Sequence, residues 1–422
     1  MLTIPFIKDN KEKVISGLEK RNFKSIFLVD EAIELDEERK LTQFELDNLL
    51  AENNAIAKEI GILFKEGKQN EAEILKQKTA ENKEKTKELQ DKLQNIQSTL
   101  LDILYQIPNI PYEKVKAGKS AEDNEEIYRN NRAFETSENR LPHWDLAKKY
   151  NLIDFELGVK ITGAGFPVYL GKGARLQRAL IQFFLDRNTE AGYLEVVPPF
   201  VVNEASAFGT GQLPDKEGQM YHDAQDNLYL IPTSEIPVTN IYRDEILSTN
   251  DFPIKMTAYS PCFRREAGSY GKDVRGLNRL HQFEKVEIVR IEKPENSYTA
   301  LEEMVEHVKT LMEDLELPFR ILRLCGGDTG FASAMTYDFE VWSAAQERWL
   351  EVSSVSNFET FQANRLKLRY KEEGKTALCH TLNGSALALP RIVAGLLENH
   401  QTGNGIVIPE KLRKYTGFDL IN

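Results

Sequence analysis

A long proline-free stretch constrains the fold of this chain more than any other feature. Between about Leu41 and Leu104 the sequence contains no proline and is rich in Glu, Lys, Gln, Leu and Ala, most of which favour helices. Apolar residues recur there at alternating steps of three and four, which is the spacing of a heptad seam. The stretch therefore predicts two long amphipathic helices.

A turn-forming segment, Gly67–Asn70, separates the two helices, so their seams should pair as an antiparallel hairpin reaching about 50 Å. In the predicted register Asn53 lies opposite Thr86 and Ile56 lies opposite Asn82. Such polar seam residues bury little apolar area, so we expect the outer half of the hairpin to be weakly held. The first seam comprises Leu46, Leu49, Asn53, Ile56, Ile60 and Leu63, and the second Leu75, Thr79, Asn82, Thr86, Leu89, Leu93, Ile96, Leu100 and Ile103.

Charge is unevenly distributed along the hairpin. The segment from Asp30 to Glu38 is strongly acidic, whereas lysines outnumber acids around Lys76, Lys78, Lys83, Lys85 and Lys87. One interpretation is a solvated coiled coil with Glu–Lys pairs. The other is a local basic surface for nucleic acid. The net charge of -12 excludes only a protein that coats nucleic acid indiscriminately.

Length and composition favour two domains. The 422 residues are 41% hydrophobic and 28% charged, enough for one large core and a second unit. Prolines return at Ile107–Pro111, which ends the hairpin and predicts domains at 1–106 and 107–422. No apolar run suits export or a membrane, so a cytoplasmic protein is expected. Three widely spaced cysteines favour neither a disulfide framework nor a zinc site.

The second domain mixes short β-rich runs with helices. The absence of regular βαβ alternation predicts an α+β fold with a mainly antiparallel sheet. No GxGxxG or GxxxxGK[ST] motif occurs, which argues against a Rossmann or P-loop nucleotide site. The predicted strands are Leu194–Val202, Ile254–Tyr259, Phe283–Ile291 and Ile321–Leu324, and the predicted helices are Gly173–Glu190 and Tyr298–Leu315.

A charged triplet, Arg264-Arg265-Glu266, follows one predicted strand. If the triplet continues that strand, Arg264 and Glu266 point to one face, where they could grip a phosphate and a base edge. A loop rich in glycine and charge, Ala267–Leu280, leads to a second strand within Arg279–Ile288 that should run antiparallel to the first.

These segments together resemble motif 2 of class II aminoacyl-tRNA synthetases, in the form used by bacterial-type seryl-tRNA synthetases. Other segments agree in the order that this family requires, and the resemblance covers nearly the whole chain. They are Gly192–Val202, which resembles motif 1 at a dimer interface, Thr233–Glu235, which resembles the TxE loop, Glu351–Ser354 with Phe361–Ala363, and Leu382–Ser385 leading to Arg391, which resembles motif 3.

The resemblance implies ATP-dependent attachment of L-serine to tRNA(Ser), and to tRNA(Sec) where it exists. The reaction would pass through a seryl-adenylate and release diphosphate and AMP. Arg264 and Arg391 are the implied catalytic residues. Arg264 would hold the α-phosphate and the attacking carboxylate, and Arg391 the γ-phosphate, because a guanidinium binds phosphate bidentately.

The remaining site residues also follow from the resemblance. Phe283 would stack on adenine, Glu266 would accept from its amine, and Glu351 with Ser354 would bind Mg2+. His281 is expected to be a structural hydrogen-bonding residue. The implied ATP-binding residues are Arg264, Arg265, Glu266, Phe283, Glu351, Val352, Ser353, Ser354 and Arg391, and the implied serine-binding residues are Thr233, Ser234, Glu235, Glu287 and Ser385.

The same resemblance implies that the chain forms a homodimer in which the hairpin of one subunit binds the long variable arm of tRNA(Ser). The acceptor end of that tRNA would enter the active site of the other subunit. Lysines of the hairpin would act through phosphates. Ala386, Ala388 and Pro390 stand where motif 3 usually has small glycines, and Val355 and Asn364 stand where many relatives have cysteine and arginine. These departures affect fine positioning and remove no implied charged residue.

Two other functions compete with this one. A paralogue that passes the activated amino acid to a carrier protein would lack a full hairpin, and this chain has one. A non-catalytic coiled-coil protein would be free to lose Arg264, Glu266, Glu351 and Arg391, and all four are present.

Replacing Arg264 tests the assignment of the motif. Arg264→Ala should cost at least about 3 kcal/mol in the adenylation transition state, because a charge-assisted contact at the reacting phosphate is lost. Folding should be unchanged. The measurement is serine-dependent exchange of labelled pyrophosphate into ATP, and normal kinetics in a folded Arg264→Ala protein would mean that the motif is misassigned.

Overall fold

The computed structural model describes residues 1–132, 140–215, 218–266 and 275–422. Its contacts divide the chain into two compact units. One unit contains Leu2–Glu19 and Phe23–Pro108, and the other contains Asn109–Asn422 with Met1 and Lys20–Asn22. Among the described helices, none has the combination of length and apolar character that a membrane span requires.

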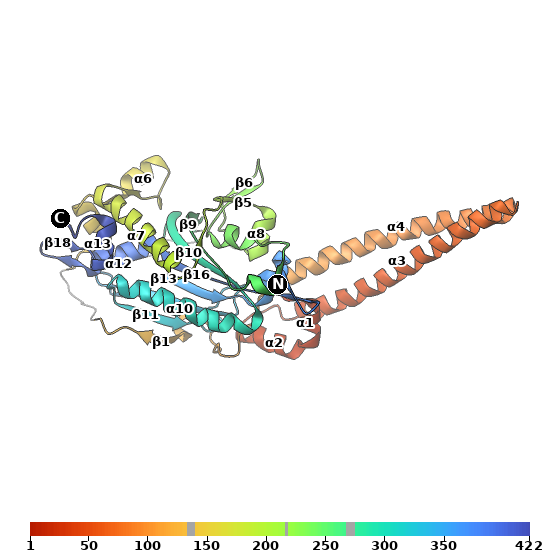
Figure 1. Ribbon diagram of the computed structural model, residues 1–422, viewed down its shortest axis with the longest axis horizontal. Coiled ribbons are helices and arrows are strands. Elements are labelled where there is room, and N and C mark those ends of the chain that lie inside the picture. Colours follow the sequence, from red (N-terminus) through yellow and green to blue (C-terminus); the bar gives the residue numbers. More distant parts are fainter. Residues whose placement is uncertain (133–139, 216–217, 267–274) are drawn as a thin grey trace. The chain divides into compact units, whose positions relative to one another are not determined.

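The N-terminal unit is helical, with α1 (Ile4–Asp9) and α2 (Lys11–Lys20) followed by the two long helices α3 (Leu28–Lys65) and α4 (Gln69–Gln106). Figure 1 shows α3 and α4 lying side by side as a long hairpin. Helix α3 starts earlier than predicted, because the acidic segment Asp30–Glu38 contains no helix breaker and simply continues the helix. The turn is shorter than predicted: Gly67 adopts a φ of +78°, and Gln69 already begins α4.

Burial along the hairpin follows the predicted seam. From Phe44 to Lys65 every residue is exposed except the six predicted seam positions, and all nine predicted seam positions of α4 are buried or half-buried. The Asn53 amide lies 3.5 Å from the Thr86 hydroxyl, which confirms the predicted register. The hydroxyls of Thr79 and Thr86 donate to carbonyls of their own helix. These seam positions therefore add little to the adhesion between the helices.

An eight-stranded sheet forms the centre of the second unit, and it confirms the mainly antiparallel prediction. All neighbours pair antiparallel except β4 and β9, which are parallel. The order across the sheet is β1 (Glu125–Arg129), β11 (Phe319–Arg323), β12 (Met335–Ser343), β13 (Arg348–Asn357), β16 (His380–Ala388), β10 (Gln282–Glu292), β9 (Ile254–Phe263) and β4 (Leu194–Glu195).

The predicted strand Leu194–Val202 is wrong as a single element. It divides into β4 and β5 (Val201–Asn203), and β5 belongs to a separate sheet with β7 (Leu228–Leu230) and β6 (His222–Asp223). Pro198 and Pro199 lie at the break, where the missing N–H groups cannot join a ladder. The two predicted helices are found as α7 (Gly171–Glu190) and α10 (Ser297–Asp314).

The main core lies between the sheet and three helices, α7, α10 and α12 (Leu389–Asn399). Phe183 of α7, Val308 of α10 and Ile392 of α12 are fully or almost fully buried there. Val286 and Ile288 of β10 belong to the same cluster. Because side chains alternate along a strand, Lys285 and Glu287 must point to the opposite face.

Shorter elements complete the second unit. The helices are α5 (His143–Lys149), α6 (Phe155–Ile161), α8 (Glu204–Thr210), α9 (Glu235–Asn240), α11 (Thr360–Leu366) and α13 (Glu410–Thr416). Three small sheets contain β2 (Ile153–Asp154) with β3 (Val168–Tyr169), β8 (Ile246–Ser248) with β14 (Arg369–Glu372) and β15 (Lys375–Leu378), and β17 (Gln401–Thr402) with β18 (Gly405–Val407) and β19 (Leu420–Ile421).

Candidate functional site

The pairing of β9 with β10 brings the first group of predicted site residues together. Phe283 pairs with Cys262 in this register, and the Arg264 N–H donates to the His281 carbonyl at 2.9 Å. The Arg264 guanidinium lies 5.1 Å from the centre of the Phe283 ring, within cation–π range. A flat ligand stacked on Phe283 would therefore lie within reach of Arg264.

The triplet Arg264–Glu266 does not continue the strand, so the prediction from strand alternation was wrong. Strand β9 ends at Phe263, and Glu266 has a φ of +46°, which no strand residue adopts. The Arg265 N–H donates to the Gln219 carbonyl at 2.8 Å. The Glu266 carboxylate, with only 15% of its side chain exposed, forms an ion pair with Arg279 at 2.9 Å. A ligand that used Glu266 would share it with Arg279.

His281 forms hydrogen bonds of the kind that were expected. Its Nδ1 lies 3.1 Å from the Arg264 carbonyl and 3.3 Å from the Tyr221 hydroxyl, and its ring stacks on Phe166. The segment Ala267–Leu280, which was expected to be a loop, lies outside the described residues up to position 274.

Arg391 lies near the start of α12 and connects this helix, through hydrogen bonds, to the other site residues. Its Nη1 donates to the Glu351 carbonyl at 2.8 Å and its Nε to the Asn278 carbonyl at 3.0 Å. Burial lowers the pKa of Arg391, which nevertheless remains a cation at neutral pH because an arginine starts from about 12.5. The guanidinium is thus fixed by carbonyls, and no carboxylate among the described residues forms a direct ion pair with it.

Strand β13 supplies two side chains to the site and not four. The Ser354 hydroxyl lies 3.4 Å from the exposed Glu351 carboxylate. Val352, by contrast, belongs to the core cluster, and the Ser353 hydroxyl donates to the Ser385 carbonyl at 2.5 Å. Val352 and Ser353 could therefore contact a ligand only through their backbone.

Glu351 and Ser354 offer oxygen atoms of the kind that Mg2+ prefers. Among the described residues, no group of three or more histidine, cysteine or acidic side chains is arranged to hold a metal ion. These two residues fit a magnesium ion that takes its other ligands from water and nucleotide phosphates. That is the coordination expected for an ion that enters together with ATP.

A cavity of about 430 Å³ adjoins this strand and is lined by Glu235, Asp338, Glu351 and Ser354, among others. Asp338 on β12 lies opposite Ser354 in the strand register. Burial first, and then the nearby Glu351 charge, raise the pKa of Asp338 well above its usual range. Sequence patterns did not single out Asp338, because its place beside Ser354 is fixed only by the pairing of β12 with β13.

A second group of predicted residues forms a buried polar cluster. Lys285 Nζ lies 2.5 Å from the Glu287 carboxylate and donates to the Thr233 hydroxyl at 2.8 Å. Glu287 also lies opposite Ser385 in the pairing of β10 with β16. Ser234 is not part of this cluster, since its buried hydroxyl lies near the Ala258 carbonyl of β9.

Glu235 lies beside this cluster and is held by a residue that the sequence did not assign. The Gln362 amide donates to the Glu235 carboxyl at 2.6 Å, and Gln362 in turn accepts from the Thr381 hydroxyl at 2.7 Å. Burial, followed by the negative charge of Glu287, raises the pKa of Glu235 to about 7. The cluster therefore contains a carboxyl that changes its charge near neutral pH.

Lys285 could have been found from the sequence. It stands between Phe283 and Glu287 on the same face of a strand, by simple alternation. Gln362 and Thr381 carry no such signal, because their contact with Glu235 depends on packing between distant segments.

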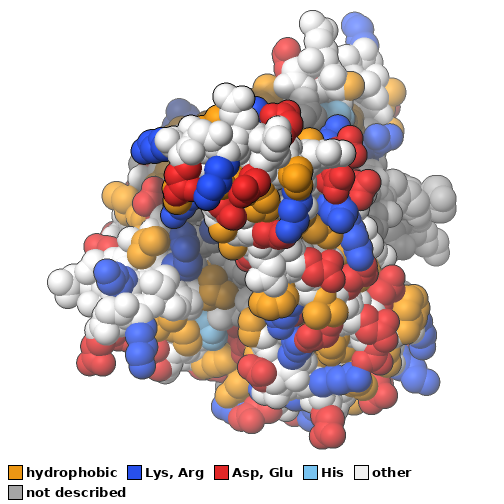
Figure 2. All heavy atoms as spheres, turned by 90° about the vertical axis from the view of Figure 1, so that its right-hand side faces the viewer, with side chains coloured by type: hydrophobic (Ala, Val, Ile, Leu, Met, Phe, Trp, Pro, Cys, Tyr) orange, Lys and Arg blue, Asp and Glu red, His pale blue; other side chains and the backbone are white. Residues whose placement is uncertain are grey.

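The five predicted lysines of the hairpin all lie on α4 and differ in their contacts. Lys76 pairs with Glu73 at 3.1 Å, and Lys78 pairs with Glu52 of α3 at 2.7 Å. Lys83, Lys85 and Lys87 are exposed. Lysine and arginine side chains are intermixed with acidic ones over the face shown in Figure 2. A basic surface on the hairpin would therefore be local.

Comparison with known proteins identifies the family. Residues 1–111 match the model of the seryl-tRNA synthetase N-terminal domain, and residues 219–400 match that of the tRNA synthetase class II core domain (G, H, P, S and T). The serine–tRNA ligase of Salinibacter ruber is 51% identical over 421 residues, which cover 99% of this chain and 98% of that protein. The chain belongs to the seryl-tRNA synthetase family.

Other seryl-tRNA synthetases resemble the chain over its full length. The enzyme of Caldicellulosiruptor saccharolyticus is 49% identical, with 100% of both chains covered. The crystal structure of the Pyrococcus horikoshii seryl-tRNA synthetase complexed with ATP is 35% identical with a TM-score of 0.92, covering 100% of this chain and 99% of that one. That of the cytoplasmic serine–tRNA ligase of Naegleria fowleri in complex with AMP is 28% identical with a TM-score of 0.87, over the same shares.

The buried Lys285–Glu287 pair predicts a specific effect on the stability of this protein. Lys285→Met should lower the free energy of unfolding by about 3 kcal/mol or more, because Glu287 would remain buried without its cation. Lys293→Met is the matched control, since it breaks the more exposed Lys293–Glu372 pair and should have a much smaller effect, because exposed pairs are screened by solvent. Urea denaturation measures both. Equal small effects would contradict the buried pair.

Proposed function

We propose that this chain attaches L-serine to tRNA(Ser) in two steps, first forming seryl-adenylate and diphosphate from serine and ATP, and then releasing AMP. The observation that carries this proposal is the meeting of two arginines, one aromatic ring and a buried carboxylate cluster at neighbouring strands of one sheet. Arg264 directly follows β9, Phe283 and Glu287 lie on β10, and Arg391 of α12 donates to the Glu351 carbonyl of β13.

In the first step, two anions must be brought together. The serine carboxylate attacks the α-phosphorus, and negative charge grows on the phosphate oxygens. Arg264 would hold both reacting groups while Phe283 stacks on adenine, and Arg391 would hold the γ-phosphate. Glu351 and Ser354 would hold Mg2+, which when bound neutralises phosphate charge. Arg265, Glu266, Val352 and Ser353 would complete the ATP site, the last two through their backbone.

Serine would be recognised by charge and hydrogen bonds. The carboxylates of Glu235 and Glu287 would bind its ammonium group. Thr233 and Ser385 would form hydrogen bonds with its hydroxyl, and Ser234 would support the loop that carries Thr233. Because these polar groups are buried, a substrate without a hydroxyl would leave some of them unpaired. Alanine should therefore be a poor substrate.

We also propose that residues 1–106 form the tRNA-binding domain and residues 107–422 the catalytic domain. The exposed lysines Lys83, Lys85 and Lys87, together with Lys76 and Lys78, would contact phosphates of tRNA(Ser), and of tRNA(Sec) where it exists. The enzyme would act as a homodimer that binds tRNA across its two subunits. Supporting this, Leu194 of edge strand β4 and Val197 have 66% and 83% of their surfaces exposed, as an apolar subunit contact requires.

Exchange of labelled pyrophosphate into ATP tests the first step directly. Exchange should depend on serine, and exchange with another amino acid but none with serine would refute the substrate. Transfer to tRNA(Ser) then separates this enzyme from a paralogue that loads a carrier protein, since only the former would give acid-precipitable seryl-tRNA.

The raised pKa of Glu235 predicts the direction of a pH effect. Below pH 7 this carboxyl is increasingly protonated and attracts the serine ammonium less, while the ammonium group itself gains no further charge as the pH falls. The KM for serine should therefore rise by about tenfold between pH 8 and pH 6, as for a single group with a pKa near 7. Glu235→Gln should show a high KM that no longer changes with pH. An unchanged pH profile in this variant would assign the titration to another group.

Shortening the hairpin tests the domain assignment. Asn53 and Thr86 lie within hydrogen-bonding distance, so a short Gly-Ser turn can replace the chain between them. The variant should remain a folded dimer that exchanges pyrophosphate at near-normal rates, but it should charge tRNA at least about a hundredfold more slowly, because phosphate contacts are lost. Normal charging would show that the hairpin does not bind tRNA. Loss of exchange would make the hairpin part of the catalytic core.

A further inference from the structure

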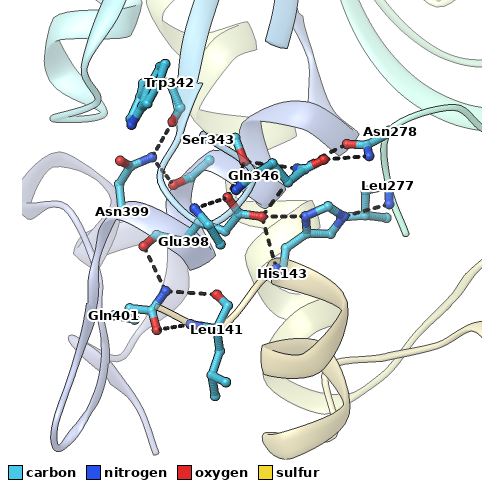
Figure 3. A network of polar contacts seen from close by, with 12 residues as sticks. Leu141, His143, Leu277, Asn278, Trp342, Ser343, Gln346, Glu398, Asn399 and Gln401 are labelled. Atoms are coloured by element: carbon cyan, nitrogen blue, oxygen red, sulfur yellow. Dashed lines mark hydrogen bonds and ion pairs between the residues drawn. The ribbon is translucent and has the colours of Figure 1, made fainter. Parts of the chain in front are cut away.

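Helix α12 is linked to the segment Leu277–Asn278 in two ways, directly through Arg391 and indirectly through Glu398. Arg391 and Glu398 are seven residues apart, so they lie on the same side of the helix. Arg391 donates to the Asn278 carbonyl at 3.0 Å. Glu398 reaches the neighbouring residue through His143 of α5, as Figure 3 shows.

The buried His143 ring connects Glu398 to the Leu277 backbone. Its Nε2 accepts from the Leu277 N–H at 2.9 Å, so Nε2 carries no proton. Its Nδ1 must therefore carry the proton and donate it to Glu398, 2.7 Å away. Both side chains are fully buried. One neutral tautomer thus forms a fixed bridge from α12 to the backbone that precedes β10.

Glu398 is itself held in place from several directions. It accepts from the backbone N–H groups of His143 at 3.0 Å and Ala345 at 3.2 Å, and from the Ser343 hydroxyl. Burial alone would raise the pKa of Glu398, but the contacts with His143 and Ser343 together outweigh it and lower this pKa. A buried carboxylate with this many donors has little freedom to move.

Residues around Glu398 and His143 also fix the positions of Asn278 and Gly276. The Asn278 side chain forms an amide pair with Gln346, donating at 2.9 Å, and Gln346 donates to Ser343 at 2.9 Å. A Cβ atom on Gly276, which has a φ of +64°, would lie 2.3 Å from His143 Nε2. The backbone from Gly276 to Asn278 is therefore fitted closely against the His143 ring.

We propose that His143 and Glu398 are positioning residues for adenylation, which fix the Asn278 carbonyl and through it the Arg391 guanidinium. This inference rests on the role of Arg391 in binding ATP that is proposed above. A guanidinium that is already fixed loses less conformational entropy when it binds a phosphate. The network should therefore affect the binding of ATP and not the binding of serine.

His143→Asn is the principal test, in the full-length chain with pyrophosphate exchange as the readout. Asparagine can keep a donor toward Glu398 but offers no acceptor at the Nε2 position. The KM for ATP should rise at least about fivefold, while the KM for serine stays within about twofold. His143→Gln, whose longer amide reaches the Nε2 position, should restore the KM for ATP. A purely structural role would reduce the amount of active enzyme and leave both KM values unchanged.

The matched control is His380→Asn. His380 is another buried histidine, with Nδ1 2.7 Å from the Ser297 hydroxyl, and it is not linked to Asn278 by the contacts described above. This variant should leave the KM for ATP unchanged, and an equal rise would overturn the inference. If His143→Asn does not fold, Gln346→Ala decides: the KM for ATP should rise about threefold because the amide pair with Asn278 is lost, and no rise would overturn the inference.

A double-mutant cycle with Arg391→Ala separates this inference from the proposed function. If His143 acts through Arg391, His143→Asn should change the KM for ATP by less than about twofold in the Arg391→Ala background. A full fivefold effect there would overturn the inference, as would normal ATP kinetics in His143→Asn beside an impaired Arg391→Ala enzyme. Normal ATP kinetics in Arg391→Ala itself would refute the proposed role of Arg391 and the inference together.

Discussion

The antiparallel pairing of β9 with β10 is the constraint on which the rest of the second unit depends. Ten residue pairs fix this register, and side-chain alternation then assigns each residue of β10 to one of two faces. Val286 and Ile288 join the core with α7, α10 and α12, while Lys285 and Glu287 are left on the other face. A slip of one residue would move the charged side chains into the core and place the apolar ones among the buried polar groups of the other face.

Charged side chains in the site are stabilised by different means. The deeply buried Glu287 has a lysine partner at hydrogen-bonding distance, whereas Glu235 has a neutral amide and a pKa near 7. Arg391 lies against carbonyl oxygens. Within the described part of the chain no carboxylate forms a direct ion pair with it, so its positive charge remains available to an anion.

The sequence was most informative where structure is local and periodic. The heptad spacing predicted the seam of the hairpin and the Asn53–Thr86 contact, because both follow from helical geometry. Alternation failed for Arg264 and Glu266, since a pattern of side chains does not show where a strand ends. Asp338 and Gln362 could not be predicted, because they reach the site through pairings between segments distant in sequence. His143 and Glu398 could not be predicted either, because most of the second unit separates them in sequence.

The edges of the large sheet affect the tendency of this chain to aggregate at high concentration. An open edge can recruit a foreign strand and start a fibril. At one edge, β4 has only two residues, too few to template a ladder. At the other, β1 has a bulge between Glu126 and Tyr128 and carries charged side chains. A sheet of this size is thereby protected at both ends against the aggregation that a long, flat, apolar edge would invite.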